Sequence, residues 1–265
     1  MRFYIFFLLL FSCCLYSQSD SIKSQYEVIY RVKMLSDTSK TKDFNEMEED
    51  LSLLIKGNKS LFKSTKKAIR DSVAYAIGKK SFENPVNGMV VLDMKAVPGV
   101  NFKSEVFLND GKQTIYKELL KNRFSYPLED AIEWKIESET KTIASYLCKK
   151  AIGKYKGREY VAWFTDSIPF PDGPYVFKGL PGLVLEVYDS KNYISFSMIS
   201  FKKVEKPIIV MKDVANTKYS TFHKARQNFL DNPSGTLSSQ IGLTIKPNDA
   251  SRINGNVKRF NNYID

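Results

Sequence analysis

Four acidic residues lie near a stretch rich in proline and glycine, and their side chains could support acid–base chemistry. They are Asp166, Asp172, Glu186 and Asp189. Two carboxyl groups held close together can share the roles of general acid and general base in a hydrolysis. Acids beside turns and strand ends more often cap backbone amides or face solvent. Without a triad, metal-ligand spacing or cofactor fingerprint beside them, we expect no catalytic residue, no metal and no cofactor.

Nucleophilic catalysis by a thiol would need a cysteine beside a base. Cys13 and Cys14 fall in an apolar N-terminal segment, so Cys148 is the only thiol expected in the mature chain, which then has no internal disulfide. The single histidine, His223, falls on a predicted helix and is interpreted as a surface side chain. Cys148 lies in a strand-like run, where cysteine usually serves as a small buried apolar group. We therefore expect an inert thiol.

The segment Trp163–Tyr188 must position any such chemistry, because it places four prolines and three glycines between two β-patterned runs. Pro181 fixes its own φ angle and Gly182 can supply the positive φ that a type II turn needs. That turn leads directly into a strand beginning at Leu183. Residues 166–178 are too apolar for a solvated linker and predict an ordered loop packed over a sheet. The residues of the structural motif are Gly179, Pro181, Gly182 and Leu183.

Several short motifs in this segment resemble the defining core of the GLPGLI family, which is named for its hexapeptide. They are Trp163-Phe164-Thr165, Ile168-Pro169, Gly173-Pro174, Phe177 and Gly179-Leu180-Pro181-Gly182-Leu183-Val184. Val184 stands where the hexapeptide has isoleucine, and both residues are β-branched and suit a strand. The resemblance is specific over residues 134–201. It implies a secreted or periplasmic protein of Gram-negative bacteria, and it brings no established activity or catalytic residue.

The loop combines a stiff backbone with bulky apolar side chains. Prolines lower the entropy that is lost when a loop is fixed, so its aromatic groups could be held ready for a ligand. The alternative is that the loop is simply the lid of a filled core. On the first hypothesis the ligand-binding residues are Trp163, Phe170, Tyr175, Phe177 and Leu180.

The N-terminus predicts export. Arg2 is followed by an apolar run, Phe3–Phe11, of signal-peptide length and too short for a membrane span. Ser17 offers a small residue for cleavage, so residues 1–17 form the predicted signal peptide and the mature chain begins near Gln18. The competing hypothesis is a lipoprotein, since Leu10 to Cys13 resembles a lipobox, although Phe11 is bulky for that motif. We favour unlipidated export and no transmembrane segment in the mature chain.

No linker or shift in composition divides the remaining chain, so residues 18–265 predict one domain. The polar tail from about residue 234 has no periodicity, and we expect it to be poorly ordered. The formal net charge of +11 could suit anionic partners. However, the lysines are scattered through strands and turns, and no phosphate loop or zinc-finger spacing accompanies them. We therefore expect no nucleic-acid partner.

Alternating apolar residues predict most of the secondary structure as strands. Gly57-Asn58 and Asn109-Asp110-Gly111 mark two hairpins. Helical spacing predicts helices over Thr65–Ile77 and Phe222–Leu230, and Ile208–Met211 suggests a short strand. The predicted strands are 26–34, 51–55, 60–62, 103–108, 113–118, 134–136, 143–152, 158–165, 183–188 and 193–201.

These elements predict an α+β protein with a curved, mostly antiparallel sheet of about eight to eleven strands and one or two helices packed on it. The order of elements is similar to the open half-barrel of periplasmic lipoprotein carriers. A closed barrel and a two-sheet sandwich are the alternatives, because a pattern of strands does not fix closure. In a half-barrel the concave apolar face is itself a ligand site.

Three functional hypotheses follow. The first is a non-catalytic envelope protein that binds or carries a lipid, a lipoprotein or an apolar peptide. The second is an interaction subunit of an outer-membrane assembly, with the loop as a docking surface for an outer-membrane protein. The third is a hydrolase that uses the carboxylates near the motif. Export and the aromatic loop favour the first.

We expect the mature protein to begin near Gln18 and to carry no lipid. Intact-mass measurement after expression in the native host checks this, because a diacylglycerol adduct on Cys13 would add a large, defined mass. Finding that adduct would instead establish a membrane-anchored lipoprotein.

Overall fold

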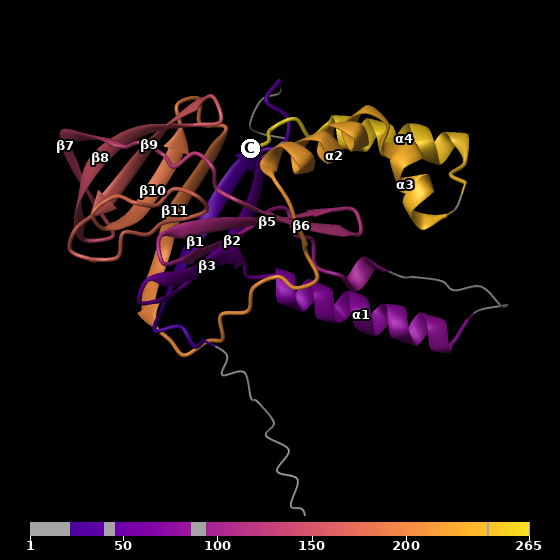
Figure 1. The fold of residues 1–265 in the computed structure, drawn as a ribbon, viewed down its shortest axis with the longest axis horizontal. Coiled ribbons are helices and arrows are strands. Elements are labelled where there is room, and N and C mark those ends of the chain that lie inside the picture. Colours follow the sequence, from indigo (N-terminus) through magenta and orange to yellow (C-terminus); the bar gives the residue numbers. More distant parts are fainter. Residues whose placement is uncertain (1–21, 40–45, 86–93, 243, 265) are drawn as a thin grey trace, which may run out of the picture.

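The computed structural model describes residues 22–39, 46–85, 94–242 and 244–264. The predicted signal peptide and its cleavage point lie outside the described residues. Within them, one sheet holds twelve strands in the order β12-β6-β5-β4-β3-β2-β1-β11-β10-β9-β8-β7 (Figure 1). The strands are β1 Tyr26–Leu35, β2 Glu46–Lys56, β3 Lys59–Ser64, β4 Glu105–Asn109, β5 Lys112–Leu119, β6 Asn122–Pro127, β7 Lys135–Ile143, β8 Tyr146–Tyr155, β9 Arg158–Thr165, β10 Leu183–Asp189, β11 Ile194–Lys203 and β12 Ala215–Asn216.

Four α-helices and one short 3-10 turn complete the described residues. They are α1 Lys67–Glu83, η2 Met94–Ala96, α2 Tyr219–Asp231, α3 Pro233–Ile241 and α4 Pro247–Lys258. The fold is therefore α+β, as predicted, with more strands and more helices than expected. None of the described helices is long and apolar enough to cross a membrane.

Two meanders make up the sheet and meet at its centre. One runs from β1 to β6, and the other runs back from β11 to β7, with β1 and β11 paired along most of their length. Every pairing is antiparallel except that of β12 with β6. The two ends of the sheet, β12 and β7, do not pair, so the sheet stays open.

A short connection forces this sheet to curve. Residues Leu128–Trp134 join β6 to β7, although nine strands lie between these two in the sheet. In a flat sheet the two strands would lie about 45–50 Å apart. The connection can span only about 30 Å. The curvature brings the connection over β8, where Gly153 has no side chain and a β-carbon would lie 2.6 Å from Ile132 and 2.8 Å from Trp134.

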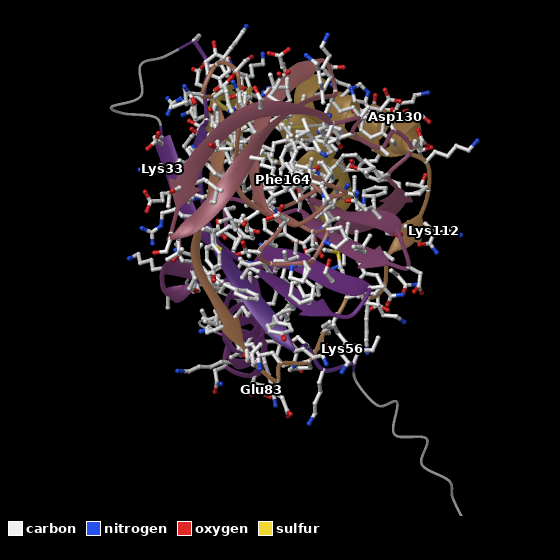
Figure 2. All side chains as sticks on the ribbon, turned by 90° about the vertical axis from the view of Figure 1, so that its left-hand side faces the viewer. Lys33, Lys56, Glu83, Lys112, Asp130 and Phe164 are labelled. Atoms are coloured by element: carbon white, nitrogen blue, oxygen red, sulfur yellow. The ribbon has the colours of Figure 1, made fainter. Side chains whose placement is uncertain are left out.

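Alternation along the strands builds one main hydrophobic core, and Leu54, Leu61 and Ile208 form a separate smaller cluster. In β1 the side chains of Val28, Tyr30 and Val32 are buried, as the sequence predicts for this strand. Figure 2 shows Phe164 of β9 inside the fold, while Lys56 and Lys112 lie at the rim. The apolar face therefore points inward along both meanders.

The helix that follows β3 differs from its prediction. We expected it to end at Gly78 and to pack on the sheet, but α1 continues through Gly78 to Glu83. It projects away from the sheet (Figure 1), and Ile69, Tyr75 and Phe82 are 57%, 74% and 71% exposed. The expected apolar spacing was present in the sequence, but only the N-terminal turn of α1, at the buried Lys67, reaches the body of the protein.

The predicted short strand at Ile208–Met211 is also wrong, because this segment runs as an irregular connection after an isolated bridge between Lys23 and Pro207. Strand β6 was not predicted. The tail after residue 234 was expected to be poorly ordered, but it forms most of α3 and all of α4.

We expect Gly182→Ala to lower the free energy of unfolding by at least about 2 kcal/mol. Gly182 has φ +149°, and a β-carbon there would lie 2.0 Å from the carbonyl oxygen of Thr165. Gly78→Ala is the matched control, because a β-carbon at this helical glycine meets nothing within 4 Å and should stabilise α1 by about 1 kcal/mol. Denaturant unfolding measures both, and a small equal effect would contradict the packing at Gly182.

Candidate functional site

Four of the five predicted ligand-binding side chains lie in the hydrophobic core. Trp163 is 6% exposed, Leu180 is 1% exposed, and Tyr175 and Phe177 are fully buried. Only Phe170 is half-buried, where it packs beside Tyr26 and Phe201. This arrangement favours the alternative in which the loop covers and fills the core, while a role in binding stays a prediction.

The loop is ordered by its prolines. At three prolines, the amide of the following residue donates a hydrogen bond to the carbonyl of the preceding residue. The donor–acceptor distance is 2.8 Å around Pro169, 2.7 Å around Pro171 and 2.7 Å around Pro181. Such three-residue turns suit the fixed φ of proline. The predicted type II turn would join Leu180 to Leu183, but the amide of Leu183 donates to the Ile168 carbonyl instead. That turn prediction was therefore wrong, although the turn and the strand after it lie where expected.

A buried ion pair fixes the centre of the loop. The Lys178 ammonium donates to the Asp172 carboxylate and, at 2.8 Å, to the Gly173 carbonyl. Both charged side chains are almost fully buried. Burial lowers the pKa of Lys178, and the Asp172 carboxylate opposes that change. The Lys178 carbonyl also accepts from the Trp134 indole at 3.0 Å, which ties the loop to the connection that curves the sheet.

Aromatic contacts from both meanders converge on the loop. The Phe177 ring lies 4.6 Å from that of Tyr160 in β9 and 5.9 Å from that of Phe196 in β11. The Tyr175 ring lies 5.6 Å from that of Phe102, which precedes β4. The loop therefore fills the concave face that the sequence offered as a ligand site.

The acidic residues near the motif do not form a carboxylate pair. Asp166 and Glu186 accept hydrogen bonds from separate lysines, Lys149 at 2.8 Å and Lys141 at 2.7 Å. Asp189 is buried and accepts from the amides of residues 193 and 194 at the turn before β11. Each acid thus has its own structural partner, as expected for acids beside turns and strand ends.

Cys148 is buried, as predicted, and burial raises the pKa of its thiol. Its sulfur lies 3.5 Å from the Tyr146 carbonyl oxygen. His223 lies on α2 as expected, but it is half-buried with its ring 5.6 Å from that of Tyr219. The thiol of Cys148 and the imidazole of His223 have different neighbours, so these two residues do not form a cysteine–histidine nucleophile.

An apolar pocket that the sequence did not predict lies beside α2. It has a volume of about 370 Å³ and is bounded by α2, the C-terminal segment, the end of β5 and the residues before β4. The helix is held on the sheet by Phe222, whose ring lies 5.5 Å from that of Tyr126 and 5.7 Å from that of Phe124 in β6. The apolar lining residues are Met34, Phe102, Leu119, Phe222, Phe229, Leu230, Val257, Phe260 and Ile264.

Buried cations lie on the wall of this α2 pocket. The Arg226 guanidinium lies 4.9 Å from the Tyr263 ring and 5.4 Å from the Phe222 ring. Burial raises the pKa of Tyr263, while Arg226 opposes that change. The Lys117 ammonium donates to the Ser104 hydroxyl at 2.7 Å. The pocket is thus apolar over most of its lining, with positive charge in its wall.

The C-terminal segment closes the α2 pocket because asparagines anchor it to the sheet. Asn262 is 1% exposed, and its side-chain amide donates to the carbonyls of Leu35 and Tyr193 and accepts from Arg158. Asn261 forms hydrogen bonds with the three residues that follow β1. It donates to the Ser36 carbonyl and the Asp37 carboxylate, and it accepts from the Thr38 amide. The aromatic residues among these asparagines were the one sequence signal that this tail packs on the fold.

The fold and this site define an α+β protein with an open, curved sheet and an apolar pocket at one edge. A family model described as a protein of unknown function (Porph_ging) matches residues 154–186. The matched segment runs from the end of β8 into β10 and contains the whole Gly179–Val184 hexapeptide. No curated protein matches the chain.

Two solved structures of PNGF-II, from two crystal forms, are similar to this chain. The first has a TM-score of 0.51 at 16% identity, and the second a TM-score of 0.49 at 17% identity. Each comparison covers 76% of this chain. The chain spans only 32% of the length of those structures. The first likeness therefore extends to the fold of a part of PNGF-II, and to the fold alone.

We expect Lys178→Met to lower the free energy of unfolding by about 3–5 kcal/mol, because it leaves the Asp172 carboxylate buried without its cation. The double variant Asp172→Asn with Lys178→Met should recover much of that loss, since no buried charge then remains. Denaturant unfolding at neutral pH measures both. If the double variant were as unstable as the single one, the uncompensated charge would not be the cause.

Proposed function

We propose that this chain is an exported, non-catalytic protein that binds or carries an apolar ligand, and that the α2 pocket is its binding site. The observation that carries the proposal is the lining of this pocket by aromatic and aliphatic side chains. Its volume of about 370 Å³ lies in the range of small-molecule sites. The concave face of the sheet, by contrast, is filled by the loop.

The position of the cations favours a ligand with an anionic end. Lys103, Lys117 and Arg226 line the pocket together with one acid, Glu118. An acyl chain or an apolar peptide could bury its apolar part against Phe229 and its neighbours and place a carboxylate near these cations. The sequence predicts a lipid, a lipoprotein or an apolar peptide as the ligand. The cations in the pocket favour those ligands of this set that carry an acidic group.

We also propose the setting of this activity. The apolar N-terminal run supports export. The hexapeptide at Gly179–Val184, which departs from the family motif only at Val184, supports membership of the GLPGLI family of periplasmic or secreted proteins. On this proposal residues 18–265 form one domain, with the sheet as an open half-barrel that is filled by its own loop. The ligand then binds at the edge of the half-barrel rather than inside it.

The proposal predicts that Leu230→Trp weakens binding of the apolar probe N-phenyl-1-naphthylamine at least about tenfold, because the larger side chain fills the pocket. Leu147→Trp is the matched control, since Leu147 is 60% exposed on β8 and does not line the pocket. Fluorescence titration measures probe affinity, and thermal unfolding checks that both variants fold.

The variant Phe170→Ala tests whether the probe binds in the α2 pocket or at the loop between β9 and β10. If the α2 pocket holds the ligand, this variant binds the probe with wild-type affinity. If Phe170→Ala lost probe binding while Leu230→Trp kept it, the binding site would be the loop and not the α2 pocket. Native mass spectrometry of protein from its own host should detect a bound apolar acid, and absence of probe binding by the wild-type protein would overturn the carrier function.

A further inference from the structure

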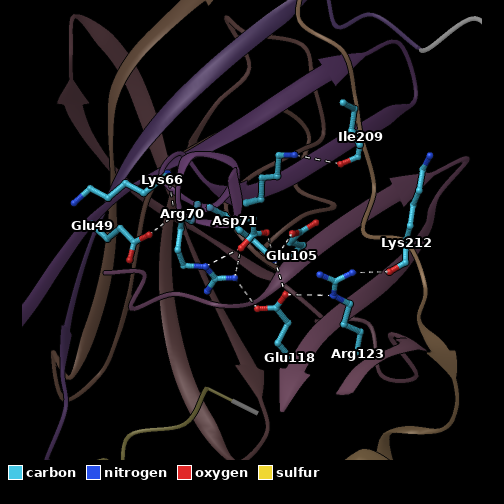
Figure 3. Close-up of polar contacts among 12 residues, drawn as sticks. Glu49, Lys66, Arg70, Asp71, Glu105, Glu118, Arg123, Ile209 and Lys212 are labelled. Carbon is cyan, nitrogen blue, oxygen red and sulfur yellow. Dashed lines mark hydrogen bonds and ion pairs between the residues drawn. The ribbon is translucent and has the colours of Figure 1, made fainter. Parts of the chain in front are cut away.

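A second pocket, distinct from the α2 pocket, lies where the N-terminal end of α1 meets the sheet. It has a volume of about 250 Å³. Its walls come from β3, α1, β4, β6 and the irregular segment 209–212. That segment is held across the pocket at both ends: Lys63 donates to the Ile209 carbonyl at 3.2 Å, and Arg123 contacts the Lys212 carbonyl at 3.5 Å (Figure 3). We call it the charged pocket.

An ionic cluster forms the floor of the charged pocket. Lys67, whose side chain is 7% exposed, lies 2.7 Å from Glu118, 3.5 Å from Asp71 and 3.6 Å from Glu105. Arg70 lies 3.1 Å from the other oxygen of Glu118. Lys67 and Glu118 therefore satisfy each other, and Figure 3 shows the cluster reaching from α1 to the strands.

Glu105 is the unsatisfied member of this cluster. The residue is 4% exposed, and its Oε2 atom has no hydrogen-bond partner within the described parts of the chain. A buried carboxyl oxygen without a partner carries a desolvation penalty. Burial raises the pKa of Glu105, which favours a protonated carboxyl that can donate. The charged and titratable groups that face the Glu105 carboxyl come from three elements. They are Lys63 from β3, Lys67 from α1, and both Tyr116 and Glu118 from β5.

Positive charge is in excess around this carboxyl. Four cations line the charged pocket and only two acids do. Two of the cations, Lys63 and Lys212, form no ion pair with any residue in the described ranges. Burial lowers the pKa of Lys63, while the nearby Glu105 opposes that change. The lining charges are Lys63, Lys67, Arg123 and Lys212 against Asp71 and Glu105.

We propose that the charged pocket binds a short dicarboxylate, with Lys63 and Lys212 pairing with its carboxylates and Glu105 donating a hydrogen bond to one of them. A dianion matches Lys63 and Lys212, because the other two cations of the lining, Lys67 and Arg123, already lie 2.7 and 3.7 Å from Glu118. The remaining lining is apolar, from Ala68, Val210 and Met211, and suits the methylene groups between two carboxylates. A fully polar anion would leave this part of the wall without a partner.

The test is calorimetric titration of the full-length mature protein with succinate between pH 6.5 and pH 8, where both carboxyl groups of succinate are ionised. We expect saturable binding that weakens as the pH rises, because Glu105 can donate only while it is protonated. Glu105→Gln should bind succinate without this pH dependence, since the carboxamide donates throughout the range. Lys63→Gln should weaken binding at least about tenfold, through loss of a charge-assisted hydrogen bond. Lys212→Gln provides a second variant if Lys63→Gln does not fold.

Three controls make the proposal falsifiable. Lys112→Gln removes an exposed cation outside the pocket and should leave succinate affinity unchanged. Sulfate and 1,4-diaminobutane should bind much more weakly than succinate. Leu230→Trp should bind succinate normally, which keeps this result separate from the carrier function. Absence of saturable succinate binding, equal losses in Lys63→Gln and Lys112→Gln, or equal affinity for sulfate would each overturn the proposal.

Discussion

The short connection between β6 and β7 is the constraint on which the rest of this structure depends. It joins two strands near opposite ends of the sheet, so the sheet has to curve until those ends approach each other. A curved sheet with an apolar inner face must bury that face, and the loop between β9 and β10 does so with Tyr175 and Phe177. The Asp172–Lys178 ion pair and the turns at proline then satisfy polar groups that the buried loop brings inside.

Because the loop fills the concave face, both pockets lie beside the meander that runs from β1 to β6, where helices and irregular segments meet the strands. The α2 pocket is closed by a C-terminal segment that asparagine side chains hold, and the charged pocket by residues 209–212. The two pockets also differ in chemistry, since aromatic rings line the first and lysines with a buried carboxyl line the second. The fold thus separates an apolar site from an ionic one.

Local patterns predicted the fold well where each strand pairs with its neighbour in the chain. Alternation in residues 26–34 predicts strand β1. The turn signals at Gly57 and Gly111 specify hairpins, because pairing there depends on adjacent residues. The same patterns could not indicate that β1 pairs with β11, nor that α1 would leave Tyr75 in solvent, because these outcomes depend on distant segments. The predicted requirement for glycine at 182 agrees with the structure, but its cause is the nearby Thr165 carbonyl rather than a type II turn.

The candidate sites were harder to predict than the strands. Sequence reasoning recognised the proline-stiffened loop but not whether a ligand or the protein itself covers it. In the sequence, Glu105 is one polar residue of a predicted strand. Only the structure shows that its side chain is buried with one carboxyl oxygen lacking a hydrogen-bond partner in the described residues. The pocket beside α2 needs Phe102, Phe222 and Ile264, which come from three separate regions of the chain.

The central seam of the sheet has a consequence for how the chain folds. Each meander consists of hairpins whose partners are close in sequence, whereas the seam joins Val28 to Phe201. Closing so long a loop costs more entropy than forming a hairpin, so we expect the hairpins to form early and the seam late. The N-terminal strand must then wait, with one edge unpaired, until β11 is available. A chain with this topology therefore completes its sheet only when its residues as far as β11 are available to pair with β1.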